Sequence, residues 1–145
     1  MKEIKTVKKF KKYLNGFTLV EILIVVVIVG ILAAIAIPTY YSYVKKGYAT
    51  EAKTQLKSIV QAADMYYSER GEAAPDVETM EAEGFIEINQ SVKNKWEFEL
   101  NLDPTGDGGS CTATSTEEMS GGAGEVVTYD VATGKFTGYG QGTQE

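Results

Sequence analysis

The chain contains no histidine and only one cysteine, Cys111, among its 145 residues. The lack of histidine excludes serine–histidine triads and histidine metal ligands, and it leaves the cysteine without a histidine base. A single cysteine cannot form an intramolecular disulfide, and we expect it to be buried as a small apolar side chain. Neighbouring acids such as Glu97 and Glu99 are more typical of a solvated face than of acid–base catalysis. The sequence therefore predicts no enzyme and no cofactor.

Basic residues are scarce beyond the first 16 positions. This leader holds six of the 14 basic residues, all lysines, against one acid, Glu3. Without the leader, the chain keeps eight basic and 19 acidic residues, a net charge of −11. Such a surface is soluble and repels copies of itself, and it does not favour binding to nucleic acid. We expect no nucleic-acid partner.

The sequence contains only one long apolar run. Ile22 to Ile37 contains no charge, and the addition of Phe17 to Val20 gives a segment interrupted only by Glu21. Its length suits a membrane span of about 20 residues, and the basic leader places the N-terminus in the cytoplasm. An ionised carboxylate in hydrocarbon costs roughly 2.5–3.5 kcal/mol on insertion scales. Glu21 therefore indicates a charged partner during assembly rather than catalysis.

The order of basic leader, Gly16-Phe17, Thr18-Leu19-Val20-Glu21, apolar run and Ala36-Ile37-Pro38 resembles the class III signal of type IV pilins and pseudopilins. The close resemblance covers about residues 11–48, and the chain is most similar to a type IVa pilin subunit. It implies that a prepilin peptidase cleaves after Gly16 and that Phe17 becomes the N-methylated first residue. It further implies that Glu21 meets the Phe17 amine of a neighbouring subunit, with Thr18 as an additional hydrogen-bond donor. Finally, the resemblance implies that the helix loosens at Gly30 and Pro38 when the subunit is assembled into a filament.

The resemblance also implies a cellular role. The precursor would cross the bacterial inner membrane once, with its N-terminus in the cytoplasm. An inner-membrane assembly platform and its ATPase would then add it to an extracellular helical homopolymer used for attachment, motility or related pilus functions. Two alternatives stay open. One is a pseudopilin of a type II secretion system, and the other is a soluble secreted domain released by cleavage after Ala36, because Ala34-Ile35-Ala36 fits an ordinary signal site.

Apolar periodicity extends the helix from Phe17 to about Arg70, with Gly71 as its stop. One stripe collects most of the apolar residues beyond Pro38, namely Tyr41, Val44, Tyr48, Ala52, Leu56, Ile59, Ala63 and Tyr66. Other residues lie off this stripe: Lys46, Lys53, Lys57, Tyr40 and Tyr43. The lysines are either solvated or opposite acidic heads of neighbouring subunits. The tyrosines are expected to pack between subunits.

The remaining residues predict a small antiparallel sheet after a loop region. A short helix or turn capped by Asp76 is expected over Val77–Ala82. Strands are expected at Lys95–Leu102, Ser110–Thr116, Glu125–Val131 and Lys135–Tyr139, and Gly134 should supply a positive φ in the last hairpin. The fold class is α+β. The domains are a leader (1–16), a membrane or filament-core helix (17–38), an amphipathic helix (39–70) and a sheet head (71–145).

The turn at Asp103 to Asp107 is the only candidate metal site. Its two carboxylates and exposed carbonyls could bind Ca²⁺, and the resemblance adds that major pseudopilins carry calcium in this part of the head. An EF-hand needs further acids and a distal glutamate, which are missing. An Asp-Pro/Gly turn without metal is the favoured interpretation.

Overall fold

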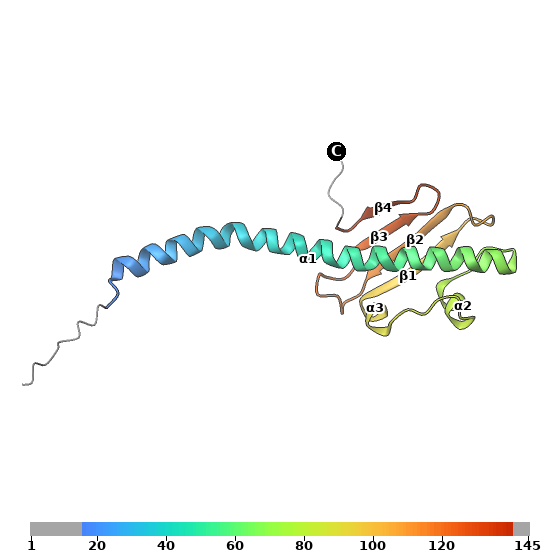
Figure 1. The fold of residues 1–145 in the computed structure, drawn as a ribbon, viewed down its shortest axis with the longest axis horizontal. Helices are drawn as coiled ribbons and strands as arrows, with labels where there is room; N and C mark the ends of the chain where they lie inside the picture. The colour runs from blue at the N-terminus through green and yellow to red at the C-terminus, as the bar shows by residue number, and fades with distance from the viewer. Residues whose placement is uncertain (1–15, 141–145) are drawn as a thin grey trace, which may run out of the picture. The chain divides into compact units, whose positions relative to one another are not determined.

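A computed structural model describes residues 16–140 and shows one long helix, two short helices and a four-stranded sheet (Figure 1). The elements are α1 (Leu19–Arg70), α2 (Val77–Ala82), α3 (Gln90–Lys95), β1 (Trp96–Leu102), β2 (Gly109–Ser115), β3 (Val126–Asp130) and β4 (Lys135–Gly138). The leader residues 1–15 and the tail 141–145 lie outside the described residues. The predicted α+β class, with a long N-terminal helix and a small antiparallel sheet, is confirmed.

Internal contacts divide the chain into two units between Ile37 and Pro38. In the first unit the helix carries apolar side chains on all sides, and Glu21 is its one charged residue. It is the one helix among the described residues that is long and apolar enough to cross a membrane. α1 remains helical through Gly30 and Pro38. Because proline has no backbone N–H, the helix lacks one hydrogen bond at Pro38.

In the second unit, one face of α1 covers the sheet. The buried residues of this face are Ala49, Ala52, Leu56, Ile59, Val60, Ala62, Ala63 and Tyr66. The predicted stripe is confirmed from Tyr48, which is half-buried, to Tyr66. At Tyr41 the prediction is wrong, because this side chain is 68% exposed. Gly140, the last described residue, approaches the helix at Lys45 and Ala49, which lie one to two turns beyond Tyr41.

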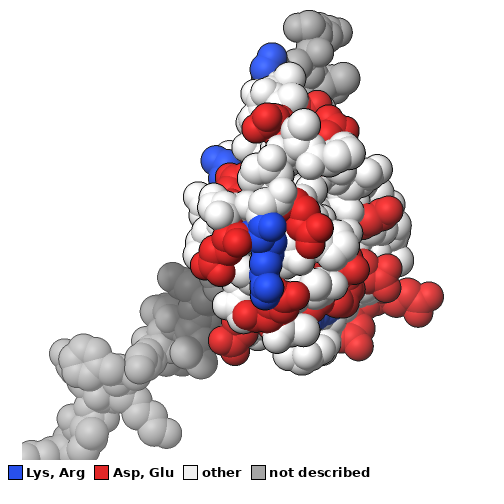
Figure 2. Space-filling view, turned by 90° about the vertical axis from the view of Figure 1, so that its right-hand side faces the viewer, with Lys and Arg blue, Asp and Glu red and all other residues white. Residues whose placement is uncertain are grey.

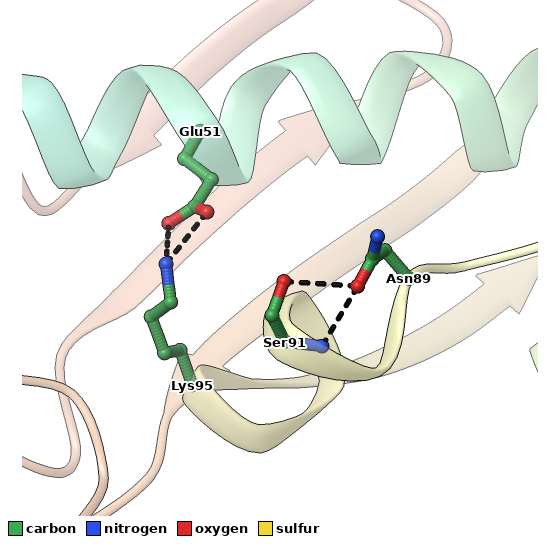
Figure 3. A network of polar contacts seen from close by, with 4 residues as sticks. All are labelled: Glu51, Asn89, Ser91 and Lys95. Carbon is green, nitrogen blue, oxygen red and sulfur yellow. Dashed lines mark hydrogen bonds and ion pairs between the residues drawn. The ribbon is translucent and has the colours of Figure 1, made fainter.

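The ends of the helices follow local chemistry. Gly71 adopts a φ of 76°, and its N–H donates to the Tyr67 carbonyl at 2.8 Å, as is common just after a helix. The predicted cap of α2 is confirmed, since the Asp76 carboxylate accepts a hydrogen bond from the Thr79 N–H at 2.7 Å. The sequence prediction missed α3, which Asn89 caps in the same way (Figure 3).

The four strands form one antiparallel sheet in the order β1-β2-β3-β4. The expected alternation along β1 is confirmed: Trp96 and Leu100 are buried, whereas Glu97 and Glu99 are exposed. The other strands begin and end within one residue of their predicted limits. The last hairpin turns at Gly134, where φ is 67° as expected.

The core lies between α1 and the sheet. The sheet contributes Trp96, Leu100, Cys111, Ala113 and Val127, and the loop region adds Val77, Met80 and Ile88. The predicted burial of Cys111 is confirmed, since its side chain has no exposed surface. An ion pair between Glu51 of α1 and Lys95 of α3, at 2.8 Å, joins the long helix to the start of β1 (Figure 3).

The C-terminal part of the head is held without a disulfide. Ser115 is buried, donates its hydroxyl to the Gly122 carbonyl at 2.7 Å, and accepts the Glu125 N–H at 2.8 Å. These bonds close the loop between β2 and β3. Beyond β4, Tyr139 packs edge-on against Trp96 and lies under the Lys45 ammonium, which is 4.6 Å from its ring centre. Side-chain packing and hydrogen bonds thus hold this part of the head together.

Candidate assembly site at the start of the long helix

Thr18 and Glu21 form a reciprocal pair at the first turn of α1. The Glu21 N–H donates to Thr18 Oγ1 at 3.2 Å, and the Thr18 N–H donates to Glu21 Oε2 at 2.7 Å. The Thr18 hydroxyl donates a further hydrogen bond to Oε2 at 2.8 Å. This arrangement is a capping box, which satisfies two N–H groups that the helix start leaves without partners. Sequence reasoning missed it, although the Thr-x-x-Glu spacing is its usual signature.

The two oxygens of the Glu21 carboxylate differ in their hydrogen bonding. Both bonds from Thr18 end on Oε2, whereas Oε1 accepts none from residues 16–140. A carboxylate has lone pairs on both oxygens for additional donors. The capping box therefore fixes the side chain and leaves Oε1 available for a cation from outside the chain.

Large apolar side chains surround this carboxylate and continue along the first unit. Phe17 is 83% exposed, and Leu19 is 79% exposed. The described residues bury no side chain of the apolar stretch. Exposed apolar surface on this scale needs lipid or protein to cover it. Gly16 and Gly30 are also exposed, and a Cβ added at either position would meet no atom within 4 Å.

The Asp103 turn closes on itself. The Asp103 carbonyl accepts the Gly106 N–H at 2.8 Å, and the Asp103 N–H donates to the Gly108 carbonyl at 3.0 Å. The Asp103 carboxylate lies against Gly108, where an added Cβ would be only 2.4 Å from Oδ2. Residues 16–140 contain no group of three or more acidic or cysteine side chains placed to hold a metal. The turn is thus closed by backbone hydrogen bonds of Asp103, and Asp103 and Asp107 do not belong to any such group among the described residues.

The charges on the head are unevenly distributed. The face shown in Figure 2 carries far more acidic than basic side chains. Lys53 and Lys57 both lie over the Phe136 ring of β4, at 5.7 and 5.6 Å from its centre. Tyr40 and Tyr43 are 66% and 69% exposed, so they lie off the buried face as predicted. The described surface thus combines an acidic face with lysines gathered beside β4.

Residues 11–37 match the family described as the prokaryotic N-terminal methylation motif. The fimbrial protein EcpC of Eikenella corrodens is 35% identical over 119 residues, which are 81% of this chain and 74% of the relative. The type IV major pilin protein PilA of Myxococcus xanthus is 45% identical over 64 residues, which are 44% of this chain and 29% of the relative. The chain belongs to the type IV pilin family.

A secretion protein is also similar to this chain. The type II secretion system core protein G of Pseudomonas aeruginosa is 50% identical over 52 residues, covering 36% of this chain and 37% of the relative. The chain therefore spans about a third of this protein and of the Myxococcus pilin, and most of the Eikenella fimbrial protein. The names of the three relatives describe pilus, fimbrial or secretion proteins, and none describes an enzyme.

Proposed function

We propose that this chain is a structural subunit of a type IV pilus filament that polymerises through the first half of α1. In this proposal a prepilin peptidase cleaves after Gly16, and the amine of Phe17 becomes the methylated N-terminus. The precursor crosses the inner membrane once, and an assembly platform with its ATPase adds it to the filament. The domain limits are those expected from the sequence, with residues 17–38 in the membrane and then in the filament core.

The observation that carries the proposal is that Glu21 Oε1 accepts no hydrogen bond from residues 16–140 and lies in an apolar helix that these residues do not cover. In a filament core, burial of a carboxylate and an ammonium is unfavourable unless the two charges pair and their remaining hydrogen bonds are made. The capping box satisfies Oε2, and the Phe17 amine of a neighbouring subunit would satisfy Oε1. Packing of the apolar side chains against other copies would remove them from lipid without exposing them to water.

Two substitutions separate the capping role of Glu21 from its charge. Glutamine at the same position also forms a capping box, so Glu21→Gln keeps the local helix start but removes the carboxylate. Glu21→Ala removes both. We expect both variants to abolish filaments sheared from cells while membrane-bound protein persists. Normal filaments from Glu21→Gln would contradict the proposal, because Glu21 would then serve the helix cap alone.

Intact-mass measurement and N-terminal sequencing of the sheared protein test the processing. A chain that starts at Phe17 with one additional methyl group is expected. A chain that starts at Ile37 would instead support a soluble secreted domain. A methylated chain that stays in the cell envelope would favour a pseudopilin, the second candidate, which the identity with the secretion core protein supports.

A further inference from the structure

The sheet of the head has an open edge at β1. The backbone bonds from Thr116 N–H to the Lys95 carbonyl (2.9 Å) and from Asp103 N–H to the Gly108 carbonyl (3.0 Å) lie at the two ends of the β1–β2 ladder. In an antiparallel ladder the bonded pairs alternate, so the backbone groups of Phe98 and Leu100 point away from β2. Among residues 16–140, no hydrogen bond from another segment reaches these outward groups.

A groove of about 470 Å³ follows this edge between β1 and α2. Its apolar floor includes Val77, Ile88 and Phe98, and its charged rim contains Glu78, Glu81, Glu97, Glu99 and Lys93. Lys93 already pairs with Glu81 at 2.5 Å. The other three glutamates make no ion pair within the described residues, and we call Glu78, Glu97 and Glu99 the acidic flank.

The opposite edge of the head carries the complementary charge. β4 is the other edge strand and contributes Lys135, while Lys53 and Lys57 of α1 lie over its Phe136 ring. We call Lys53, Lys57 and Lys135 the basic flank. None of these lysines has an ion-pair partner in the described part of the chain. Their charges are therefore available to another molecule.

The spacing of the charges also matches. Glu97 and Glu99 lie on the same face of β1, about 7 Å apart at two residues' rise. Lys53 and Lys57 are one helical turn apart, with Cβ atoms about 5–6 Å from each other. Two parallel ion pairs between these residues are consequently possible. Because the two flanks are different surfaces of one chain, their contact is heterologous, and a heterologous contact that does not close into a ring generates a helical array.

From this complementarity we infer that the acidic flank of one copy docks against the basic flank of the next copy in the filament. The inference rests on the proposed function and adds a partner surface in the head to the contact made by the helix. Phe98 and Leu100 keep their outward backbone groups available for the neighbouring copy, and this contact would shield the β1 edge from pairing with other strands.

Cysteine cross-linking of the full chain tests the contact. Cys111 is buried, so it should not react with a short bis-maleimide. Filaments of the Glu99→Cys/Lys57→Cys chain should yield a ladder of covalent oligomers. Neither single variant should do so, because each contact joins position 99 of one copy to position 57 of another. Filaments of the double variant without a ladder would overturn the inference and leave the proposed function intact. Equally efficient dimers from one single variant would also overturn it.

Charge reversal provides the second measurement. Glu97→Lys/Glu99→Lys and Lys53→Glu/Lys57→Glu should each lower the yield of sheared filaments at least about tenfold, since like charges would oppose each other. The four substitutions together should restore the yield. Glu117→Lys/Glu118→Lys is the matched control, because it makes the same charge change on the exposed loop after β2. Normal assembly of either reversed pair, or failure of the fourfold variant to recover, would refute the contact. Absence of filaments from the unmodified chain would instead refute the proposed function.

Discussion

Replacement of Ser115 by alanine should destabilise the head more than its small change in volume implies. Ser115 is only 4% exposed, and its hydroxyl bonds both the Gly122 carbonyl and the Glu125 N–H. Backbone bonds lie beside it: the Ser115 N–H donates to the Glu125 carbonyl and the Gly124 N–H donates to the Ser115 carbonyl, both at 2.9 Å. In a chain without a disulfide, the Ser115 hydroxyl and these backbone bonds together close the loop between β2 and β3.

The magnitude follows from the two hydrogen bonds. Each contributes about 1 kcal/mol net, and a buried group left without its partner costs about 1–3 kcal/mol. We expect Ser115→Ala to lower the free energy of unfolding by about 2 kcal/mol. For a domain of roughly 100 residues this corresponds to a fall in Tm of about 8–16 °C.

Trp96 provides the assay. It is the only tryptophan in the chain and is 1% exposed in the core of the head, so its fluorescence reports unfolding of that unit. The full chain is heated in detergent micelles. The control is Ser110→Ala, which changes the same residue type on the same strand where the hydroxyl makes no hydrogen bond within the described residues. A Tm for Ser115→Ala within about 2 °C of this control would refute the reasoning.

Three further predictions concern titration, reactivity and the glycine that follows Tyr139. Hydrogen bonds from the Thr133 backbone and side chain hold the pKa of Asp130 below its usual value, as the side chain and backbone of Thr79 do for Asp76. The stabilisation from these two ionised carboxylates is complete above the unfolded pKa of about 3.9 and is lost as the pH falls through the lower folded pKa values. Below about pH 4, the Tm of the Asp76→Asn/Asp130→Asn variant should therefore fall less steeply with decreasing pH than the Tm of the unmodified chain. Burial raises the pKa of the Cys111 thiol to about 12, and maleimide should therefore modify it at pH 8 only after denaturation; rapid labelling of the native protein would contradict this burial. Gly140→Ala would place a Cβ 2.3 Å from the Ala49 Cβ at a φ of 71°, which should lower Tm, whereas Gly122→Ala, also at positive φ but with no neighbour within 4 Å, should lower it less.

Local patterns predicted most of the elements. Three signals act within a few residues and can therefore be recognised in the sequence alone. They are the glycine after Arg70, the aspartate before Val77 and the alternation from Trp96 to Leu102. Six residues are too few to show a helical period in either α2 or α3, so α2 was predicted from its Asp76 cap, whereas the Asn89 cap of α3 was not recognised. Thr18 and Glu21 have the Thr-x-x-Glu spacing of a capping box, but a carboxylate within an apolar run also predicts a charged partner outside the chain, and the spacing does not exclude that role.

Helical period likewise placed Tyr41 on the apolar stripe, although the stripe is buried only where other elements reach it. Whether a helical face is covered depends on residues far along the chain, in this case Gly140 against Ala49. The same limit applies to the lysines. Their position off the stripe was predicted, whereas their place over the ring of Phe136 depends on how α1 crosses the sheet.

The sequence by itself determined the long helix, its apolar first half with one carboxylate, the strands of the head and membership in the pilin family, because these depend on periodicity and on motifs of adjacent residues. Only the tertiary structure decided which oxygen of Glu21 accepts no hydrogen bond from the described residues, how Ser115 and Tyr139 close the head, and that acidic and basic flanks lie on opposite edges of the sheet. Those features arise from contacts between residues 7 to 94 positions apart, such as Ser115 with Gly122 and Lys45 with Tyr139, or from side-chain geometry, and neither is encoded in a local pattern.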